Sequence, residues 1–189
     1  MKKIAIFASG RGSNAENIIK YFKGSTKIKV QLIASNNSDS VVLNKAKKYA
    51  VKTLIFDKQE LNNGRVLKVL KFEKIDFIVL AGFLLKIPTT IINEYLNKII
   101  NIHPSLLPLY GGKGMYGINV HKQVAKSKDI ESGITIHFVN PIYDAGAVIF
   151  QAKCRLYPNI KPKDIQKKVH TLEIKFFPRI IENLLDAKN

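Results

Sequence analysis

Cysteine, arginine and long apolar segments are the scarce features of this 189-residue sequence. Cys154 is the single cysteine, so no disulfide can form within the chain, and a cytoplasmic protein is the economical interpretation. No apolar stretch approaches the roughly 20 residues that span a bilayer. The start, "MKKIAIFASGRG", has only a short apolar run, which favours a first strand over a secretory signal. We therefore expect no membrane partner.

The scarcity of arginine decides how the charge is interpreted. A formal net charge of +17 suggests nucleic-acid binding. However, 27 of the 31 basic residues are lysines, whereas arginine is the residue that reads guanine edges and binds phosphate bidentately. The lysines are scattered and have no aromatic residues interleaved with them. We expect a solvated basic surface without a specific nucleic-acid partner. A basic phosphate- or nucleic-acid-binding protein is the alternative from another functional class.

Short strand-like runs alternate with helical patterns along the first hundred residues. Strands are expected at 2–8, 28–35, 52–56, 76–82 and 98–103, and helices at 14–23, 41–49, 60–74 and 88–96. Two further strands, at 132–140 and 147–157, and a final helix at 162–185 follow. This rhythm favours an open, mostly parallel sheet. We predict one α/β domain over residues 1–189, with a three-layer, Rossmann-like sheet of about seven strands and helices on both faces.

The segment "SGRGSN", residues 9–14, joins the first strand to the first helix. Gly10 and Gly12 permit a tight turn, and the backbone N–H groups of residues 12–14 at a helix start can bind an anion. The spacing also fits a loose dinucleotide fingerprint, yet Asn36 and Asn37 stand where an acidic ribose partner is expected. A monophosphate is therefore favoured. A glycine turn that only lets the helix pack is the alternative.

Asn101 and His103 end the fifth expected strand, in "NIHPS". Side chains two residues apart on a strand point to one face, and ligands of such sheets bind at the carboxyl ends of the strands. An amide can donate to a developing oxyanion, and an imidazole can exchange a proton near neutral pH. A single histidine at a strand end is usually structural. The pair at this position indicates catalysis.

Asp144 lies in "NPIYDAGAVI", between the last two expected strands. One interpretation is a turn-forming residue, which is common for Asp near Gly. The other is a carboxylate that raises the pKa of His103 by stabilising its imidazolium. Spacing alone leaves both interpretations open.

The motif "NIHPSLLP", with "SGRGSN" before it and "GITIHFV…DAGAVIFQAK" after it, resembles the phosphoribosylglycinamide formyltransferases. The resemblance runs from Ile4 to the C-terminal helix. It implies a formyltransferase fold and transfer of a formyl group from the co-substrate 10-formyltetrahydrofolate to the amine of N1-(5-phospho-D-ribosyl)glycinamide, in de novo purine (IMP) biosynthesis. The products would be the N-formyl ribonucleotide and tetrahydrofolate. It implies direct attack by the amine, without a metal.

The resemblance also assigns roles to residues. The catalytic residues would be Asn101, His103 and Asp144. The ribonucleotide would contact Gly12, Ser13, Asn14, His170, Thr171, Leu172 and Glu173. The folate would contact Phe83, Leu84, Leu85, Lys86, Ile87, Asn101, Asn140, Pro141, Ile142, Tyr143 and Asp144. Residues 1–100 would then form a phosphate- and nucleotide-binding half, and residues 101–189 a catalytic and folate-binding half.

Three departures from the family pattern are visible. His170 stands where some members have Gln, so the phosphate contact would be partly cationic. Some members have a folate-contacting Arg before the third helix, for which Lys58, Gln59 and Arg65 are equal counterparts here. The loop "GGKGMYG" at 111–117 is longer than in the shortest members, and its lysine could approach an anion.

Two further histidines and the single cysteine are expected to have structural roles. His121 and His137 are expected to be structural, without an implied partner, and Cys154 to be a buried hydrophobe. Another 10-formyltetrahydrofolate-dependent formyltransferase or hydrolase is the alternative within formyl transfer. The methionyl-tRNA and sugar-nucleotide enzymes are longer, and the hydrolase has an additional N-terminal domain, so the chain length favours the ribonucleotide enzyme. Both a monomer and a homodimer fit the sequence.

Overall fold

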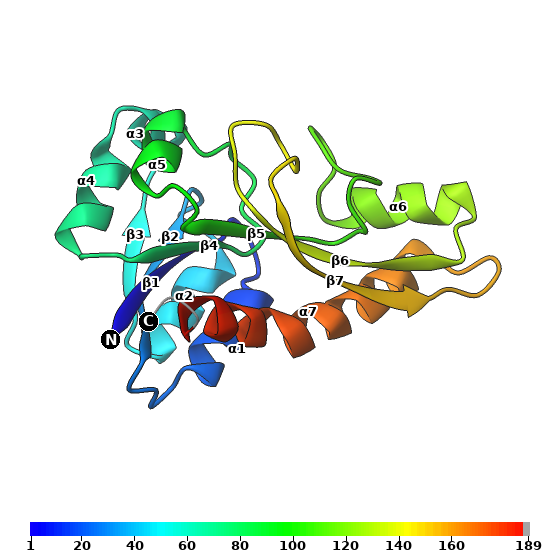
Figure 1. Ribbon diagram of the computed structural model, residues 1–189, viewed down its shortest axis with the longest axis horizontal. Coiled ribbons are helices and arrows are strands. Elements are labelled where there is room, and N and C mark those ends of the chain that lie inside the picture. The colour runs from blue at the N-terminus through cyan, green and yellow to red at the C-terminus, as the bar shows by residue number, and fades with distance from the viewer. Residues whose placement is uncertain (187–189) are drawn as a thin grey trace.

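The computed structural model describes residues 1–186 and contains a seven-stranded sheet (Figure 1). The strands are β1 Lys2–Phe7, β2 Ile28–Ser35, β3 Lys52–Ile55, β4 Phe77–Leu80, β5 Ile99–His103, β6 Glu131–Phe138 and β7 Val148–Arg155. Their order is β3-β2-β1-β4-β5-β6-β7. The first five strands are parallel, and β6 and β7 are antiparallel. The predicted, mostly parallel α/β sheet is confirmed.

Helices cover both faces of the sheet (Figure 1). They are α1 Ser13–Tyr21, α2 Val41–Lys48, α3 Lys58–Asn62, α4 Arg65–Phe72, α5 Thr89–Glu94, α6 Ile118–Ser127 and α7 Pro162–Asp186. Because strand side chains alternate between faces, β1 contributes Ile4 and Ile6 to a core with α1, α2 and α7. Its Ala5 and Phe7 belong to a second core with α3, α4 and α5. The three-layer arrangement is therefore confirmed.

Two predicted features of the helices need correction. The single helix expected at 60–74 is wrong, because α3 and α4 are separate. Asp57 Oδ1 accepts a hydrogen bond from Glu60 N at 2.7 Å, and Glu60 Oε2 accepts one from Asp57 N at 3.0 Å, so a capping box starts α3 early. Gly64, with φ of 89°, then separates the helices. The other feature is α6, for which the sequence predicts His121 as a helix residue but no helix bounds, although Val120 and Val124 have helical spacing.

The register between β5 and β6 places the polar residues of the site. These strands are antiparallel, with Asn101 opposite His137 and His103 opposite Thr135. Ile100 and Ile102 point into the core with α7, so the polar side chains share the other face. Between residues 1 and 186, no helix is both long and apolar enough to cross a membrane.

Candidate active site

A cavity of about 980 Å³ lies at the carboxyl ends of β1, β4 and β5. Its wall includes the continuous segments 10–14, 80–87, 101–104 and 112–117, together with side chains from the loop before β7 and from α7. The cavity therefore uses residues from both the N-terminal and C-terminal halves of the chain. This is the edge at which parallel sheets bind their ligands.

The glycine turn before α1 forms one end of the cavity. Gly12 caps α1 with φ of 65°, in the left-handed region that favours glycine. A Cβ at this position would lie 2.3 Å from Cγ2 of Val42 on α2. Glycine is thus required for helix packing, and residues 10–14 also line the cavity. Both interpretations of the turn are compatible with the structure.

Helix α7 brings a carboxylate and an imidazole to this end. Asn14 Nδ2 donates to Glu173 Oε2 at 2.9 Å, and His170 Nδ1 donates to the same oxygen at 2.9 Å. The hydrogen bond from Glu173 is the main cause that raises the pKa of His170. Residues 170 and 173 lie one turn apart on the helix and both line the cavity.

The two residues between His170 and Glu173 on α7 do not line the cavity. Thr171 donates from Oγ1 to the carbonyl of Lys167, and Leu172 packs against the core on the inner side of α7. Neither contributes to the cavity wall. The helical period explains this placement, because residues i+1 and i+2 point away from the face shared by i and i+3.

His103 and Asp144 meet inside the cavity. Nε2 of His103, a residue only 4% exposed, donates to the carbonyl of Tyr110 at 2.8 Å, and Nδ1 lies 3.6 Å from Asp144 Oδ1. That separation suits a charge pair or one bridging water rather than a direct hydrogen bond. Asp144 Oδ2 also accepts from Gly112 N at 2.7 Å, and Asp144 has φ of 53°. The aspartate therefore forms part of a turn and also faces the histidine.

His137 is the residue that sequence reasoning missed. It is 2% exposed, and its Nε2 lies 3.1 Å from Asn101 Nδ2 and 3.7 Å from Asp144 Oδ1. The expectation that it has no partner is wrong. Strand β6 has the same pattern as β5, with two polar residues, Thr135 and His137, two positions apart. However, only the antiparallel register of β5 and β6 reveals that these residues face each other.

His121 on α6 is a further buried histidine in the cavity wall. Within the described part of the chain, its Nδ1 has no hydrogen-bond partner. Burial is the main cause that lowers the pKa of His121 to about 4. The ring is therefore uncharged at neutral pH.

The other end of the cavity is more apolar. The predicted folate segment Phe83, Leu84, Leu85, Lys86 and Ile87 lines it, as do Asn140, Ile142, Tyr143 and Asp144. Pro141 and the three candidates Lys58, Gln59 and Arg65 do not. Lys86 Nζ lies 5.7 Å from the centroid of the Tyr143 ring, which joins the two segments by a cation–π contact. The glycine loop also contributes Lys113 to the wall.

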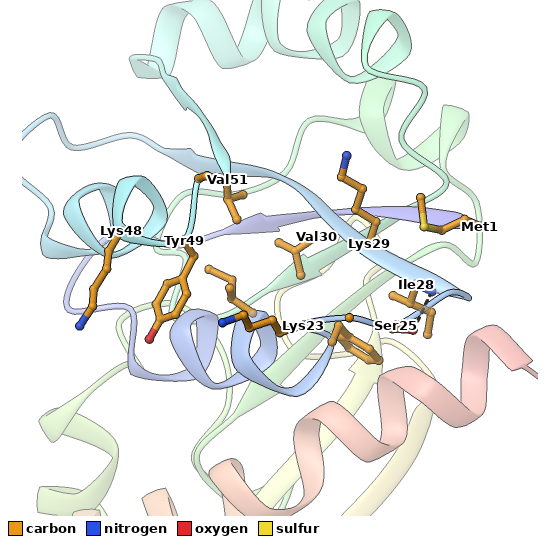
Figure 2. A pocket seen from close by; sticks show the side chains of 13 residues that line it. Met1, Lys23, Ser25, Ile28, Lys29, Val30, Lys48, Tyr49 and Val51 are labelled. Atoms are coloured by element: carbon orange, nitrogen blue, oxygen red, sulfur yellow. Dashed lines mark hydrogen bonds between the residues drawn. The ribbon is translucent and has the colours of Figure 1, made fainter.

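A second, smaller pocket of about 440 Å³ lies between α1, the end of α2 and β2. Its wall has no histidine or carboxylate side chain. Figure 2 shows Lys29 and Lys48 extending in opposite directions rather than converging. Of the two cavities, only the larger therefore has histidine and carboxylate side chains in its wall. Within residues 1–186, no group of three or more His, Cys, Asp or Glu side chains could hold a metal ion.

An amide, a histidine and an aspartate therefore lie together at the carboxyl edge of this sheet, in the wall of the larger cavity. Residues 2–181 match the family described as formyl transferase, and the chain belongs to that family. It is 37% identical over 194 residues to phosphoribosylglycinamide formyltransferase, chloroplastic, of Arabidopsis thaliana, covering 99% of this chain and 66% of that protein. It is 31% identical over 188 residues to phosphoribosylglycinamide formyltransferase of Haemophilus influenzae, covering 96% of this chain and 86% of that protein.

The fold agrees with these relatives. The crystal structure of phosphoribosylglycinamide formyltransferase from Anaplasma phagocytophilum superposes with a TM-score of 0.90 at 29% identity. The superposition covers 99% of this chain and 88% of the other. The predicted formyltransferase fold is therefore confirmed.

Proposed function

We propose that the chain transfers the formyl group of 10-formyltetrahydrofolate to the amine of N1-(5-phospho-D-ribosyl)glycinamide, in de novo purine biosynthesis. The products are the N-formyl ribonucleotide and tetrahydrofolate. The observation that carries the proposal is the convergence of Asn101, His103 and Asp144 in one cavity. The same cavity is lined by the N-terminus of α1, whose backbone N–H groups can bind an anion. Membership of the formyl transferase family and the names of its relatives support the same reaction.

The two substrates are assigned to opposite ends of the cavity. Backbone N–H groups of Gly12, Ser13 and Asn14, with protonated His170, bind the phosphate. Glu173, which accepts two hydrogen bonds in the structure, has further lone pairs for ribose hydroxyls. The pterin and its tail occupy the apolar end, between residues 83–87 and 140–144. We assign no direct contact to Thr171, Leu172 or Pro141, which lie outside the wall.

The reaction begins when the substrate amine attacks the formyl carbon and forms the new C–N bond. Negative charge then develops on the formyl oxygen, and an N–H of Asn101 donates to it. His103 in its protonated form adds a second donor through Nδ1, because Nε2 is occupied by the carbonyl of Tyr110. The carboxylate of Asp144 balances this charge. Oxyanion donors of this kind contribute about 10²–10³ in rate.

Collapse of the tetrahedral intermediate breaks the bond between the formyl carbon and the folate nitrogen. Protonated His103 gives a proton to the departing folate nitrogen, directly or through a water held near Asp144, whose Oδ1 lies 3.6 Å from Nδ1. The neutral imidazole then takes up the proton that the attacking amine, now bonded to the formyl carbon, must lose. Atoms and charge balance without a metal or a covalent enzyme intermediate.

The remaining expectations are part of the proposal. We infer a chain that acts as one formyltransferase domain on small molecules, as a monomer or homodimer, without specific nucleic-acid binding. A cytoplasmic location stays a prediction; the Arabidopsis relative is named chloroplastic. The division into halves at residue 100 is less sharp than the sequence suggests, since α7 contributes His170 and Glu173 beside the first turn.

The experiment is a measurement of tetrahydrofolate formation from 10-formyltetrahydrofolate with three acceptors: the glycinamide ribonucleotide, initiator methionyl-tRNA and water alone. Turnover that depends on the ribonucleotide is the expected result. Equal turnover without an acceptor would indicate a hydrolase, and turnover only with tRNA would indicate the other transferase. Either of these outcomes contradicts the proposal.

A further inference from the structure

Both ring nitrogens of His137 have partners that define its protonation. Nδ1 lies 2.8 Å from the backbone oxygen of Phe138, which can only accept a hydrogen bond, so Nδ1 carries a proton. Burial is the main cause that lowers the pKa of His137, and the ring is therefore uncharged at neutral pH. Nε2 then has a free lone pair and acts as an acceptor.

The acceptor on His137 determines which way the Asn101 amide is turned. The group 3.1 Å from Nε2 must be a donor, so it is Nδ2 of Asn101 and not the amide oxygen. The register keeps the two residues directly opposite each other on β5 and β6. Nδ2 has a second N–H, and Asn101 lies in the wall of the cavity. That second N–H is available to a ligand oxygen.

The titratable neighbours of His137 are Asp144 and His103. Asp144 Oδ1 is 3.7 Å from Nε2, beyond the range of a good hydrogen bond. Asp144 is hydrogen bonded through Oδ2 to Gly112 N at 2.7 Å. His103 donates its Nε2 proton to Tyr110. Both neighbours are thus held by other backbone groups, which leaves Asn101 as the donor to His137.

Building on the formyl transfer proposed above, we propose that His137 is a positioning residue, whose Nδ1–H tautomer turns the Asn101 amide so that an N–H meets the oxyanion. A reversed amide would present a carbonyl lone pair to the same negative oxygen, which is repulsive. Asn101 is the group that touches the substrate. His137 acts only through it.

The kinetic test compares two substitutions of His137. His137→Leu removes the acceptor and should lower kcat by about tenfold or more, part of the 10²–10³ that an oxyanion donor contributes. KM for each substrate should change much less. His137→Gln retains an acceptor near the position of Nε2 and should recover most of kcat. Ile136→Val, a buried neighbour on β6, controls for lost packing, and its kcat should stay near wild type at a similar loss of thermal stability.

A double-mutant cycle separates positioning from any other role. In the Asn101→Ala background, His137→Leu should cause no further loss of kcat, because the amide that it orients is gone. Multiplicative losses in the double variant would overturn the proposal. Equal kcat values for the Leu and Gln variants in the Asn101 wild-type background would do the same.

A spectroscopic test does not depend on catalysis. The chain has four histidines, and ¹⁵N NMR of the histidine-labelled wild type should show a ring with Nδ1 protonated and Nε2 bare near neutral pH, besides any signal of His170, whose Nδ1 also donates a hydrogen bond. Loss of those signals in His137→Gln assigns them. A protonated Nε2 at His137 contradicts the inference even if formyl transfer is observed. A bare Nε2 in a protein without formyl transfer contradicts the proposed function instead.

Discussion

Nδ2 of Asn14 donates a hydrogen bond to Oε2 of Glu173 at 2.9 Å, although 159 positions separate the two residues in the chain. The bond joins the start of α1 to the middle of α7, at one end of the large cavity. His170 donates to the same oxygen. The anion-binding turn and the carboxylate are therefore parts of one site rather than two.

Substitution of Glu173 tests the assignment of this end to the ribonucleotide. Glu173→Gln should raise KM for the ribonucleotide by about tenfold or more, since hydrogen bonds to charged groups contribute about 1.5–3 kcal/mol. KM for 10-formyltetrahydrofolate should stay near the wild-type value. The matched control is Glu182→Gln, on the same helix, whose carboxylate accepts from Tyr21 outside the cavity. An equal rise in both KM values would contradict the assignment.

The protonation of His170 gives this binding step a pH dependence. Glu173 raises the pKa of His170 above its ordinary value, so the ring is charged below that raised pKa and loses its charge as the pH rises through it. Ribonucleotide affinity should therefore fall with rising pH in the alkaline part of the range, where the phosphate is already a dianion because its second pKa is about 6. Titration calorimetry from about pH 7 to 9 measures this.

Two variants decide whether His170 causes the trend. His170→Asn should bind more weakly at pH 7 and show a flat profile. Glu173→Gln should move the fall to lower pH, because the group that raises the pKa of His170 is removed. A profile that is unchanged in His170→Asn would assign the pH dependence to another group.

The alternation of strands and helices was sufficient to predict the sheet, because each buried parallel strand is a short apolar run followed by a turn. Apolar spacing alone did not predict the split between α3 and α4, because the signals for it are polar and glycine residues: the capping box of Asp57 and Glu60, and Gly64 between the helices. Asn101 and His103 were identifiable because two residues on one strand share a face. The partner role of His137 depends on pairing between strands, which a single sequence does not specify.

Asp144 has two separable tasks in the structure, which are to hold the glycine loop and to face His103. Asp144→Asn keeps an oxygen acceptor for Gly112 N but removes the charge, so kcat should fall strongly while the loop stays ordered. Asp144→Ala removes both and should also increase hydrogen exchange at Gly112. Hydrogen-exchange mass spectrometry of residues 111–117, alongside kcat, separates the two tasks. Similar exchange in the Asn and Ala variants would argue against the hydrogen bond to the loop.

We expect Glu16 to account for part of the loss of folding stability at acidic pH. Its hydrogen bond with Lys45, followed by that with Lys20, lowers the pKa of Glu16 to about 2. The resulting stability is fully present above the ordinary pKa of about 4.5 and is lost as the pH falls toward the lowered value. Glu16→Gln should lower Tm at pH 7 and show a smaller further loss between about pH 5 and 2 than wild type. Calorimetry at both ends of this range measures the difference, and identical acid profiles would contradict it.

The decisive measurement is the steady-state kcat of His103→Ala with the ribonucleotide and 10-formyltetrahydrofolate, at saturating concentrations of both and with folate binding measured separately. The donated proton and the charge beside the oxyanion are lost together, so kcat should fall by about 10² or more. Folate affinity should stay close to wild type, because the lost interaction matters mainly in the transition state. Asn101→Ala should cost a comparable factor, and the double variant should lose less than the product of the two. If His103→Ala keeps more than roughly a tenth of wild-type kcat, a loss below the usual general acid–base contribution, the mechanism proposed for this site is wrong.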